Sequence, residues 1–276
     1  MPAGEIALFV LFGVVVGAYG TLVGAGGGFV VVPILLLVYH ATPRQAIGTS
    51  LVVVFFNALS GTAAYIRQKR VDYQTGWRFA AATVPGSIIG AYLSSFFTSR
   101  FFDGLFGVLL IVLAVFLNLR PDASRARPQT MGEGTPLPPH QVRRDIVDAD
   151  GGRFVYVFNP RRGVVLSFFV GFLSSILGIG GGIVHVPAMV YFFSFPAHVA
   201  TATSHFVLVI TALTGAASHL ALGDVLWLPA LSMSVGAVVG AQGGALISRR
   251  LKGQTIVRVL SLALVVVGLR LLANVL

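Results

Sequence analysis

Long apolar stretches are the feature of this sequence that most constrains its fold. They recur from Glu5 to Leu119 and again from Gly163 to Leu276, and a bilayer-spanning helix needs about 20 such residues. Only 10% of the 276 residues are charged, against about 25% in soluble globular domains. Uninterrupted stretches such as Leu105 to Leu119 lack the alternation of barrel strands. The sequence therefore predicts an all-α integral membrane protein.

The apolar stretches form two sets of five, and the second set repeats the first. The run "GAGGGFVVVP" (24–33) returns as "GIGGGIVHVP" (178–187), and the same offset of 154 residues relates Ser50 to Ser204. Internal duplication is a recurring feature of secondary transporters. The expected membrane segments are 5–23, 28–40, 44–66, 76–98 and 101–119, followed by 163–177, 182–194, 198–219, 225–247 and 254–276.

The duplication also predicts how the chain is divided. A first membrane repeat (1–119) and a second one (163–276) flank a basic cytoplasmic connector (120–162), which is partly flexible and includes a short strand at 154–158. Late in each repeat, "PGSIIGA" from Pro85 matches "VGAVVGA" from Val235. The offset there is 150 residues, so we expect a loop four residues shorter in the second half.

Basic residues change places between equivalent loops of the two halves. The loop with Arg67, Lys69 and Arg70 corresponds to one around Asp224 that has no Lys or Arg. Because Lys and Arg favour cytoplasmic loops, the two repeats are expected to be inverted, with both termini outside the plasma membrane. A parallel four-plus-four arrangement with re-entrant segments is the alternative. The same rule explains the net charge of +10, so no nucleic-acid partner is expected.

Each half carries a run of glycines at the start of an unusually short segment. The 13-residue segments 28–40 and 182–194 reach about 20 Å as helices, less than the roughly 30 Å of hydrocarbon. Each glycine costs a helix about 1 kcal/mol relative to alanine, so consecutive glycines favour a broken helix near the midplane. Close helix packing is the alternative. Neither run continues into a phosphate-binding or dinucleotide-binding motif.

The ligand expected at these breaks is a small anion. All nine acidic residues lie in loops or at segment ends, whereas free N–H groups at a broken helix favour negative charge. Neutral side chains close to the breaks supply further donors, although a hydroxyl can instead bond to its own helix. The predicted substrate-binding residues are Gly26, Gly27, Gly28, Thr49, Ser50, Asn57, Gly180, Gly181, Gly182, Thr203 and Ser204.

Histidine is the side chain in these segments that titrates near neutral pH. His185 and His205 are the candidates for proton coupling, with neutral packing as the alternative for each, while His219 lies at a segment end. The chain has no cysteine, which excludes disulfides, thiolate metal sites and cysteine nucleophiles. We expect no cofactor, no metal site and no enzymatic activity.

The paired glycine motifs, each followed by "GTS" or "ATS", resemble those of the TauE/SafE sulfite exporter family. The resemblance covers both membrane halves, and "VVLSFFVGFLSSILGIGGG" at the start of the second half belongs to it. It implies a multi-pass plasma-membrane permease that exports a sulfur-containing anion such as sulfite, sulfoacetate or a related organosulfonate. One departure is Thr211, which stands where the first half has Asn57.

Two other functions are compatible with the sequence. A non-transporting membrane scaffold would use the glycines for helix packing alone, and a passive anion channel would use the same donors without a conformational step. The sequence leaves open whether the protein forms a homo-oligomer, which anion it binds and which ion drives it.

Overall fold

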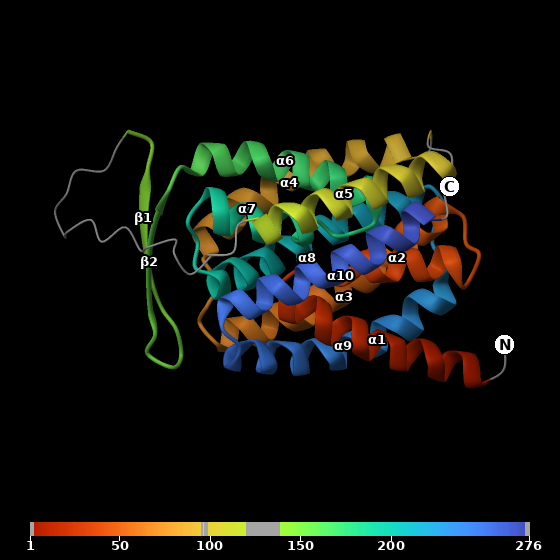
Figure 1. Ribbon diagram of the computed structural model, residues 1–276, viewed down its shortest axis with the longest axis horizontal. Coiled ribbons are helices and arrows are strands. Elements are labelled where there is room, and N and C mark those ends of the chain that lie inside the picture. Colours follow the sequence, from red (N-terminus) through yellow and green to blue (C-terminus); the bar gives the residue numbers. More distant parts are fainter. Residues whose placement is uncertain (1–2, 95, 97–98, 120–138, 274–276) are drawn as a thin grey trace.

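The computed structural model describes residues 3–94, 96, 99–119 and 139–273. Within these residues, ten helices run along the long axis of one bundle and a two-stranded hairpin lies across one end (Figure 1). The first half contributes α1 (Ala3–Val23), α2 (Gly28–Leu37), α3 (Pro43–Arg67), α4 (Tyr73–Ser94) and α5 (Ser99–Leu119). The second half contributes α6 (Pro160–Leu177), α7 (Gly182–Phe192), α8 (Ala197–Ala221), α9 (Trp227–Arg250) and α10 (Gly253–Ala273).

The helix lengths fit a membrane protein. Among the described residues, six helices are long and apolar enough to cross a bilayer, namely α1, α3, α5, α6, α8 and α9. Two apolar helices are much shorter, since α2 has 10 residues and α7 has 11. The prediction of a mainly helical integral membrane protein is confirmed, and the helices begin and end within a few residues of the predicted segments.

The hairpin was only half predicted by the sequence. Strand β2 (Arg153–Phe158) covers the predicted strand, but it pairs antiparallel with β1 (Val142–Val147), which the sequence analysis missed. Tyr156 and Phe158 are buried and pack against Phe195, in the α7–α8 loop, with ring centroids 4.2 and 5.0 Å away. This aromatic contact fixes the hairpin to the bundle. The stretch predicted to be flexible, 120–138, lies outside the described residues.

Polar side chains also attach the hairpin to the α3–α4 loop. Arg70 donates to Asp148 at 2.9 Å, and both side chains are buried. Tyr156 donates to Asp72 at 2.9 Å. The hairpin therefore holds the α3–α4 loop through buried polar contacts as well as through aromatic packing.

Contacts between the halves recur at positions 154 residues apart. Helix α1 packs along α9 and α6 packs along α4, while α3 and α8 pack on each other at the centre. At these interfaces glycines admit the backbone of the facing helix, as small residues do in membrane proteins. Such pairs include Gly86 with Phe168, Gly90 with Phe172, Gly240 with Val14 and Gly244 with Ala18.

These pairs correct the sequence alignment of the two halves. Gly86 meets Phe168 as Gly240 meets Val14, so Gly240, and not Gly236, is the counterpart of Gly86. The predicted shortening of the loop by four residues is wrong, because α4 and α9 also begin 154 residues apart. The mistake arose because glycines recur every fourth residue in α9, so two alignments match equally well.

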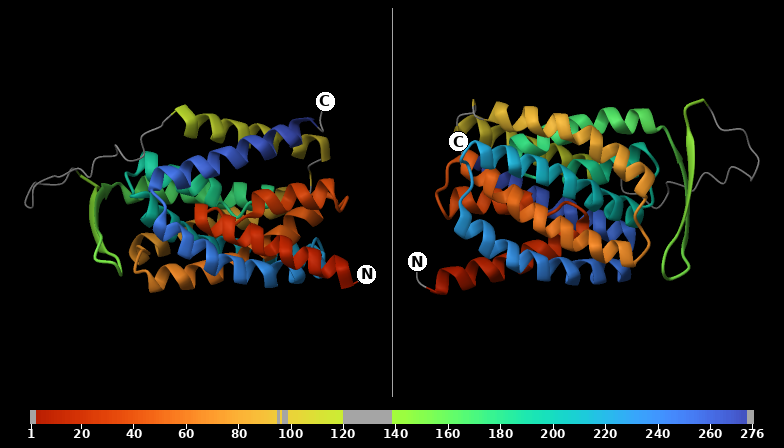
Figure 2. Two further views of the ribbon diagram at one scale, coloured as in Figure 1. Left: turned by 60° about the horizontal axis from the view of Figure 1, so that its bottom comes forward. Right: turned by 180° about the vertical axis from the view of Figure 1, so that it is seen from behind.

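The start of α1 and the end of α10 lie at one end of the bundle, and the hairpin lies at the other (Figures 1 and 2). Helix α1 starts at the end opposite the hairpin, whereas its counterpart α6 starts beside the hairpin. The two helices therefore run in opposite directions along the bundle.

Candidate functional site

The two glycine loops meet inside the bundle. Each loop ends in a glycine with a left-handed backbone, Gly27 with φ 83° and Gly181 with φ 87°, a conformation that favours glycine. A Cβ added at Gly28 would lie 2.4 Å from the carbonyl oxygen of Gly178, and one added at Gly182 would lie 2.2 Å from that of Gly24. The two loops are therefore in direct backbone contact.

This contact lies halfway along the two central helices. Val54 and Leu208 occupy the middle of the 25-residue helices α3 and α8, and both reach Gly26 and Gly180. Both side chains are fully buried and belong to one apolar cluster. The breaks in the chain are thus deep in the bundle, where an apolar pair packs against them.

The short helices start without side-chain caps. Neither α2 nor α7 has a side-chain hydrogen bond at its N-cap. Within the described residues, the N–H groups of Gly28 and Phe29, and those of Gly182 and Ile183, form no hydrogen bond. Unpaired N–H groups at a helix start, together with the helix dipole, attract an anion.

Three of the predicted donors bind the glycine loops themselves. The hydroxyl of Ser50 donates to the Gly178 carbonyl at 2.8 Å, and that of Ser204 donates to the Gly24 carbonyl at 3.2 Å. Each serine therefore holds the loop of the other half. The amide of Asn57 donates to the Gly26 carbonyl at 3.0 Å. The structure brings these side chains to the loops, where they bond to protein carbonyls.

The two threonines lie elsewhere. Thr49 accepts a hydrogen bond from the N–H of Leu226 at 2.9 Å, and Thr203 accepts one from the N–H of Asp72 at 3.0 Å. These N–H groups belong to the α8–α9 and α3–α4 loops, at opposite ends of the bundle. The contacts favour a role in holding those loops, and substrate binding by the threonines stays a prediction.

The two histidine candidates have different surroundings. His205 Nε2 lies 3.2 Å from Thr21 Oγ1, which donates to Asn57, so His205 joins the network that reaches Gly26. Its Nδ1 has no hydrogen-bond partner among the described residues. His185 Nε2 lies 3.2 Å from Ser167 Oγ. Neither ring faces a carboxylate in the described contacts, and proton coupling through them stays a prediction.

Sequence reasoning missed the carbonyl contacts that support the two loops. The hydroxyl of Tyr65 donates to the Thr21 carbonyl at 2.7 Å, and His219 Nε2 lies 3.0 Å from the Ser175 carbonyl. Both pairs are 44 residues apart and are related by the offset of 154. The offset of 154 pairs Tyr65 with His219 in the sequence, but the sequence does not reveal that each of them contacts a backbone carbonyl.

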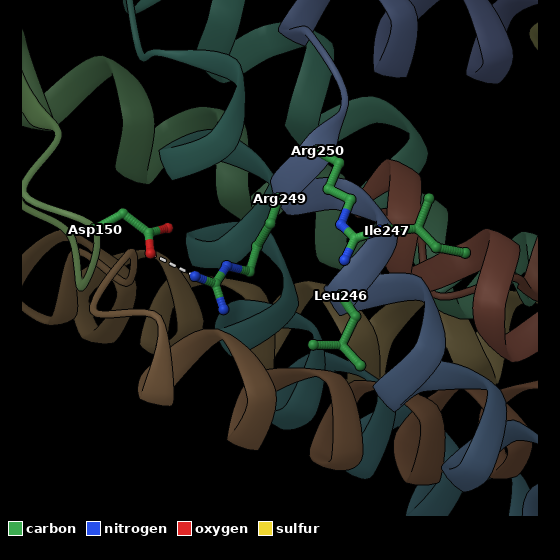
Figure 3. Close-up of a pocket in the computed structure, with 5 residues that line it drawn as sticks. All are labelled: Asp150, Leu246, Ile247, Arg249 and Arg250. Atoms are coloured by element: carbon green, nitrogen blue, oxygen red, sulfur yellow. Dashed lines mark hydrogen bonds and ion pairs between the residues drawn. The ribbon is translucent and has the colours of Figure 1, made fainter.

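A separate cavity of about 510 Å³ lies at the hairpin end of α9 (Figure 3). Leu246, Ile247, Arg249 and Arg250 line it together with Asp150 from the hairpin turn. Arg249 forms an ion pair with Asp150. The cavity lies at the end of the bundle, whereas the glycine loops lie at its middle. It presents two guanidinium groups beside apolar side chains.

The described residues hold no cluster of three or more His, Cys, Asp or Glu side chains that could bind a metal ion. The arrangement is instead that of neutral donors and unpaired N–H groups between two broken helices. Together with six helices long enough to span a bilayer, it defines a multi-pass membrane protein of the transporter class.

The chain belongs to the sulfite exporter TauE/SafE family, whose model matches residues 9–271. It is 39% identical to the probable membrane transporter protein YunE of Bacillus subtilis, over 97% of each chain. The probable membrane transporter protein YjnA of the same organism is 25% identical over 95% of this chain and 98% of its own. A probable membrane transporter protein of Xylella fastidiosa is 28% identical over 83% and 80%. No solved structure matches the chain.

Proposed function

We propose that this transporter moves a small sulfur-containing anion, such as sulfite, sulfoacetate or a related organosulfonate, out of the cell. The observation that carries the proposal is the meeting of two uncapped helix starts, α2 and α7, in the middle of the bundle. Their N–H groups offer fixed positive dipoles at a depth where water is scarce. The family name supports the choice of a sulfur oxyanion.

The two halves form an inverted repeat in this proposal. The opposite directions of α1 and α6 support it, as do the matching contacts at positions 154 residues apart. Basic residues gather at the hairpin end, in the α3–α4 loop, in the hairpin and after α9. Because such residues favour the cytoplasm, we place the connector there and both termini outside the plasma membrane.

Substrate binding requires the two loops to separate. In this conformation Ser50, Ser204 and Asn57 donate to loop carbonyls, and Val54 and Leu208 pack against the glycines. Separation would release these donors for an anion and move the apolar pair aside. The symmetric pairing of each serine with the loop of the other half suits alternating access, in which one half rocks against the other.

The cavity at the hairpin end is the proposed entry for the exported anion. Arg249 and Arg250 line it, and positive charge in a concave surface raises the local concentration of anions and their rate of association. Its position on the proposed cytoplasmic side is the reason for choosing export over import.

The test is thermal unfolding of the detergent-purified protein with sulfite, sulfate, thiosulfate, sulfoacetate, taurine or chloride. An anion at about 100 times its dissociation constant adds roughly 2.7 kcal/mol of stability. We expect one sulfur oxyanion to raise the unfolding temperature, and Ser50→Ala or Asn57→Ala to abolish the rise. Ser218→Ala is the matched control, because that hydroxyl bonds to Thr214 of its own helix.

Transport in liposomes then separates the remaining candidates. A carrier moves sulfite or an organosulfonate down an imposed gradient and saturates, whereas a channel conducts at far higher rates without a conformational step. If the purified protein moves none of these anions under any imposed ion gradient, the proposed function is wrong. The scaffold alternative would then be favoured, since it uses the glycines for packing alone.

A further inference from the structure

His219 has a hydrogen-bond acceptor at each ring nitrogen. Nε2 lies 3.0 Å from the Ser175 carbonyl oxygen, and Nδ1 lies 3.1 Å from Asp224 Oδ2. A carbonyl oxygen can only accept, so Nε2 carries a hydrogen. A neutral imidazole has a single N–H, which would leave the Nδ1 lone pair facing a carboxylate. The geometry is therefore satisfied only when the His219–Asp224 pair holds one additional proton.

Tyr65, the equivalent of His219 in the first half, makes the corresponding hydrogen bond with a side chain that does not titrate near neutral pH. Tyr65 donates its hydroxyl to the Thr21 carbonyl, which corresponds to the Ser175 carbonyl in the second half. A tyrosine hydroxyl keeps its hydrogen throughout the physiological range. The first glycine loop is thus held at any such pH, whereas the second is held through an ionisable pair.

The carbonyl that His219 binds lies next to the second glycine loop. Ser175 is three residues before Gly178, whose carbonyl accepts from Ser50. The proton on the pair therefore supports the backbone that leads into the proposed anion site. A change at His219 reaches the loop through one hydrogen bond and three residues of chain.

No second acid or base competes for this proton in the described contacts. His219 is fully buried and Asp224 is 8% exposed. The other groups against the pair are uncharged, namely the Ser175 carbonyl from α6 and Gly48 from α3. Helices α1, α3 and α10 pack on α8 and carry charged residues at the same end of the bundle as Asp224. These residues are Glu5, Arg44 and Arg270, and all three are exposed.

We propose that His219 and Asp224 form the proton-binding site of the transporter, and that loss of the proton releases the second glycine loop while the first stays held. The coupling ion would then be a proton, taken up at the end of the bundle opposite the hairpin, where Asp224 lies. The inference rests on the function proposed above only where it concerns coupling of the proton to anion transport. The proton site itself can be tested without any substrate.

The first experiment measures the unfolding temperature of the purified full chain against pH, with no anion added. We expect the unfolding temperature of the wild type to fall by about 2–4 °C as the pH rises and the pair gives up its proton. His219→Tyr copies the first half and should flatten the profile. His40→Gln is the control, because it removes an exposed histidine of the α2–α3 loop that has no part in the proposed site, and it should keep the wild-type profile.

Asp224→Asn provides a second variant in case His219→Tyr does not fold. Asparagine cannot hold the proton as a carboxylate does, so its profile should also be flat. An unchanged pH profile in the variants that fold overturns the proposal, as does a flat profile in the wild type.

The second experiment uses liposomes with an imposed pH gradient. We expect the gradient to accelerate sulfite movement several-fold in the wild type, and to have no effect in His219→Tyr although sulfite exchange at equal pH continues. Sulfite transport that responds to the gradient equally in both proteins overturns the inference alone. If the wild type moves no anion, the proposed function fails, and the unfolding profile still decides the proton site.

Discussion

The contact between the two glycine loops predicts a large cost for a single methyl group. A Cβ at position 28 would lie 2.4 Å from the Gly178 carbonyl oxygen and 2.9 Å from Val54 Cγ2, whereas ordinary contacts begin at 3.4 Å. Gly28→Ala must therefore push the loops apart by about 1 Å. Overpacking of this kind costs about 1–3 kcal/mol, and the better helix propensity of alanine returns at most about 1 kcal/mol.

At the middle of the overpacking range, about 2 kcal/mol, the net loss is about 1–2 kcal/mol, and we expect Gly28→Ala to lower the unfolding temperature by about 2–8 °C. Gly182→Ala makes the equivalent contact and should behave alike, because its Cβ would lie 2.2 Å from the Gly24 carbonyl oxygen. The control is Gly243→Ala in α9, where an added Cβ meets nothing within 4 Å. It should leave stability unchanged or raise it by up to about 1 kcal/mol.

Differential scanning fluorimetry of the three variants in one detergent measures their unfolding temperatures. The loop-contact reasoning is refuted if Gly28→Ala and Gly182→Ala unfold at the same temperature as Gly243→Ala. Loss of stability in both, with the anion-induced shift retained, would favour a packing role for these glycines over a role in binding.

Two further predictions concern the hairpin end. Arg250→Gln should raise the substrate concentration needed for half-maximal uptake into inside-out vesicles and weaken its salt dependence, whereas Arg161→Gln, at an exposed position outside the cavity, should not. Burial raises the pKa of the Asp148 carboxyl, but hydrogen bonds from Arg70 and the Gly152 N–H, with the Arg70 charge, lower it by more. A carboxyl with a lowered pKa stabilises the fold above its unfolded value of about 3.9 and ceases to do so as the pH falls through its folded value. Hydrogen exchange in residues 142–158, corrected for intrinsic rates, should therefore rise below about pH 4, and Asp148→Asn should show the faster exchange already at neutral pH.

The sequence predicted those parts of the fold that depend on local or periodic signals. Hydropathy located the ten helices, and the glycine runs located the short ones, because each signal lies within the segment it describes. The start of α3 is also local, since Thr42 and Gln45 form a capping box just before and within its first turn. The family resemblance, carried by the same glycine motifs, is confirmed by the match over residues 9–271.

Strand β1 could not be predicted in this way. Its sequence "VRRDIV" mixes charged and apolar residues without clean alternation, and its pairing depends on β2 and on aromatic residues of the α7–α8 loop. The site shows the same limit. Ser50 and Ser204 were predicted near the loops, but the sequence did not predict that each serine binds the loop of the other half. Contacts between residues more than 120 positions apart leave no local pattern in a single sequence.

Several hydrogen bonds recur at equivalent positions of the two halves. Shared contacts have one partner in the backbone, as in the bonds of Ser50 and Ser204 to glycine carbonyls. Backbone groups survive any substitution, so duplicated halves can diverge in side chains and still keep these bonds. One equivalent pair differs in proton chemistry, since Tyr65 and His219 both contact a backbone carbonyl but only His219 also faces a carboxylate. In the proposed mechanism this difference allows a response to a proton on one side of the membrane, because two identical halves would respond equally from both sides.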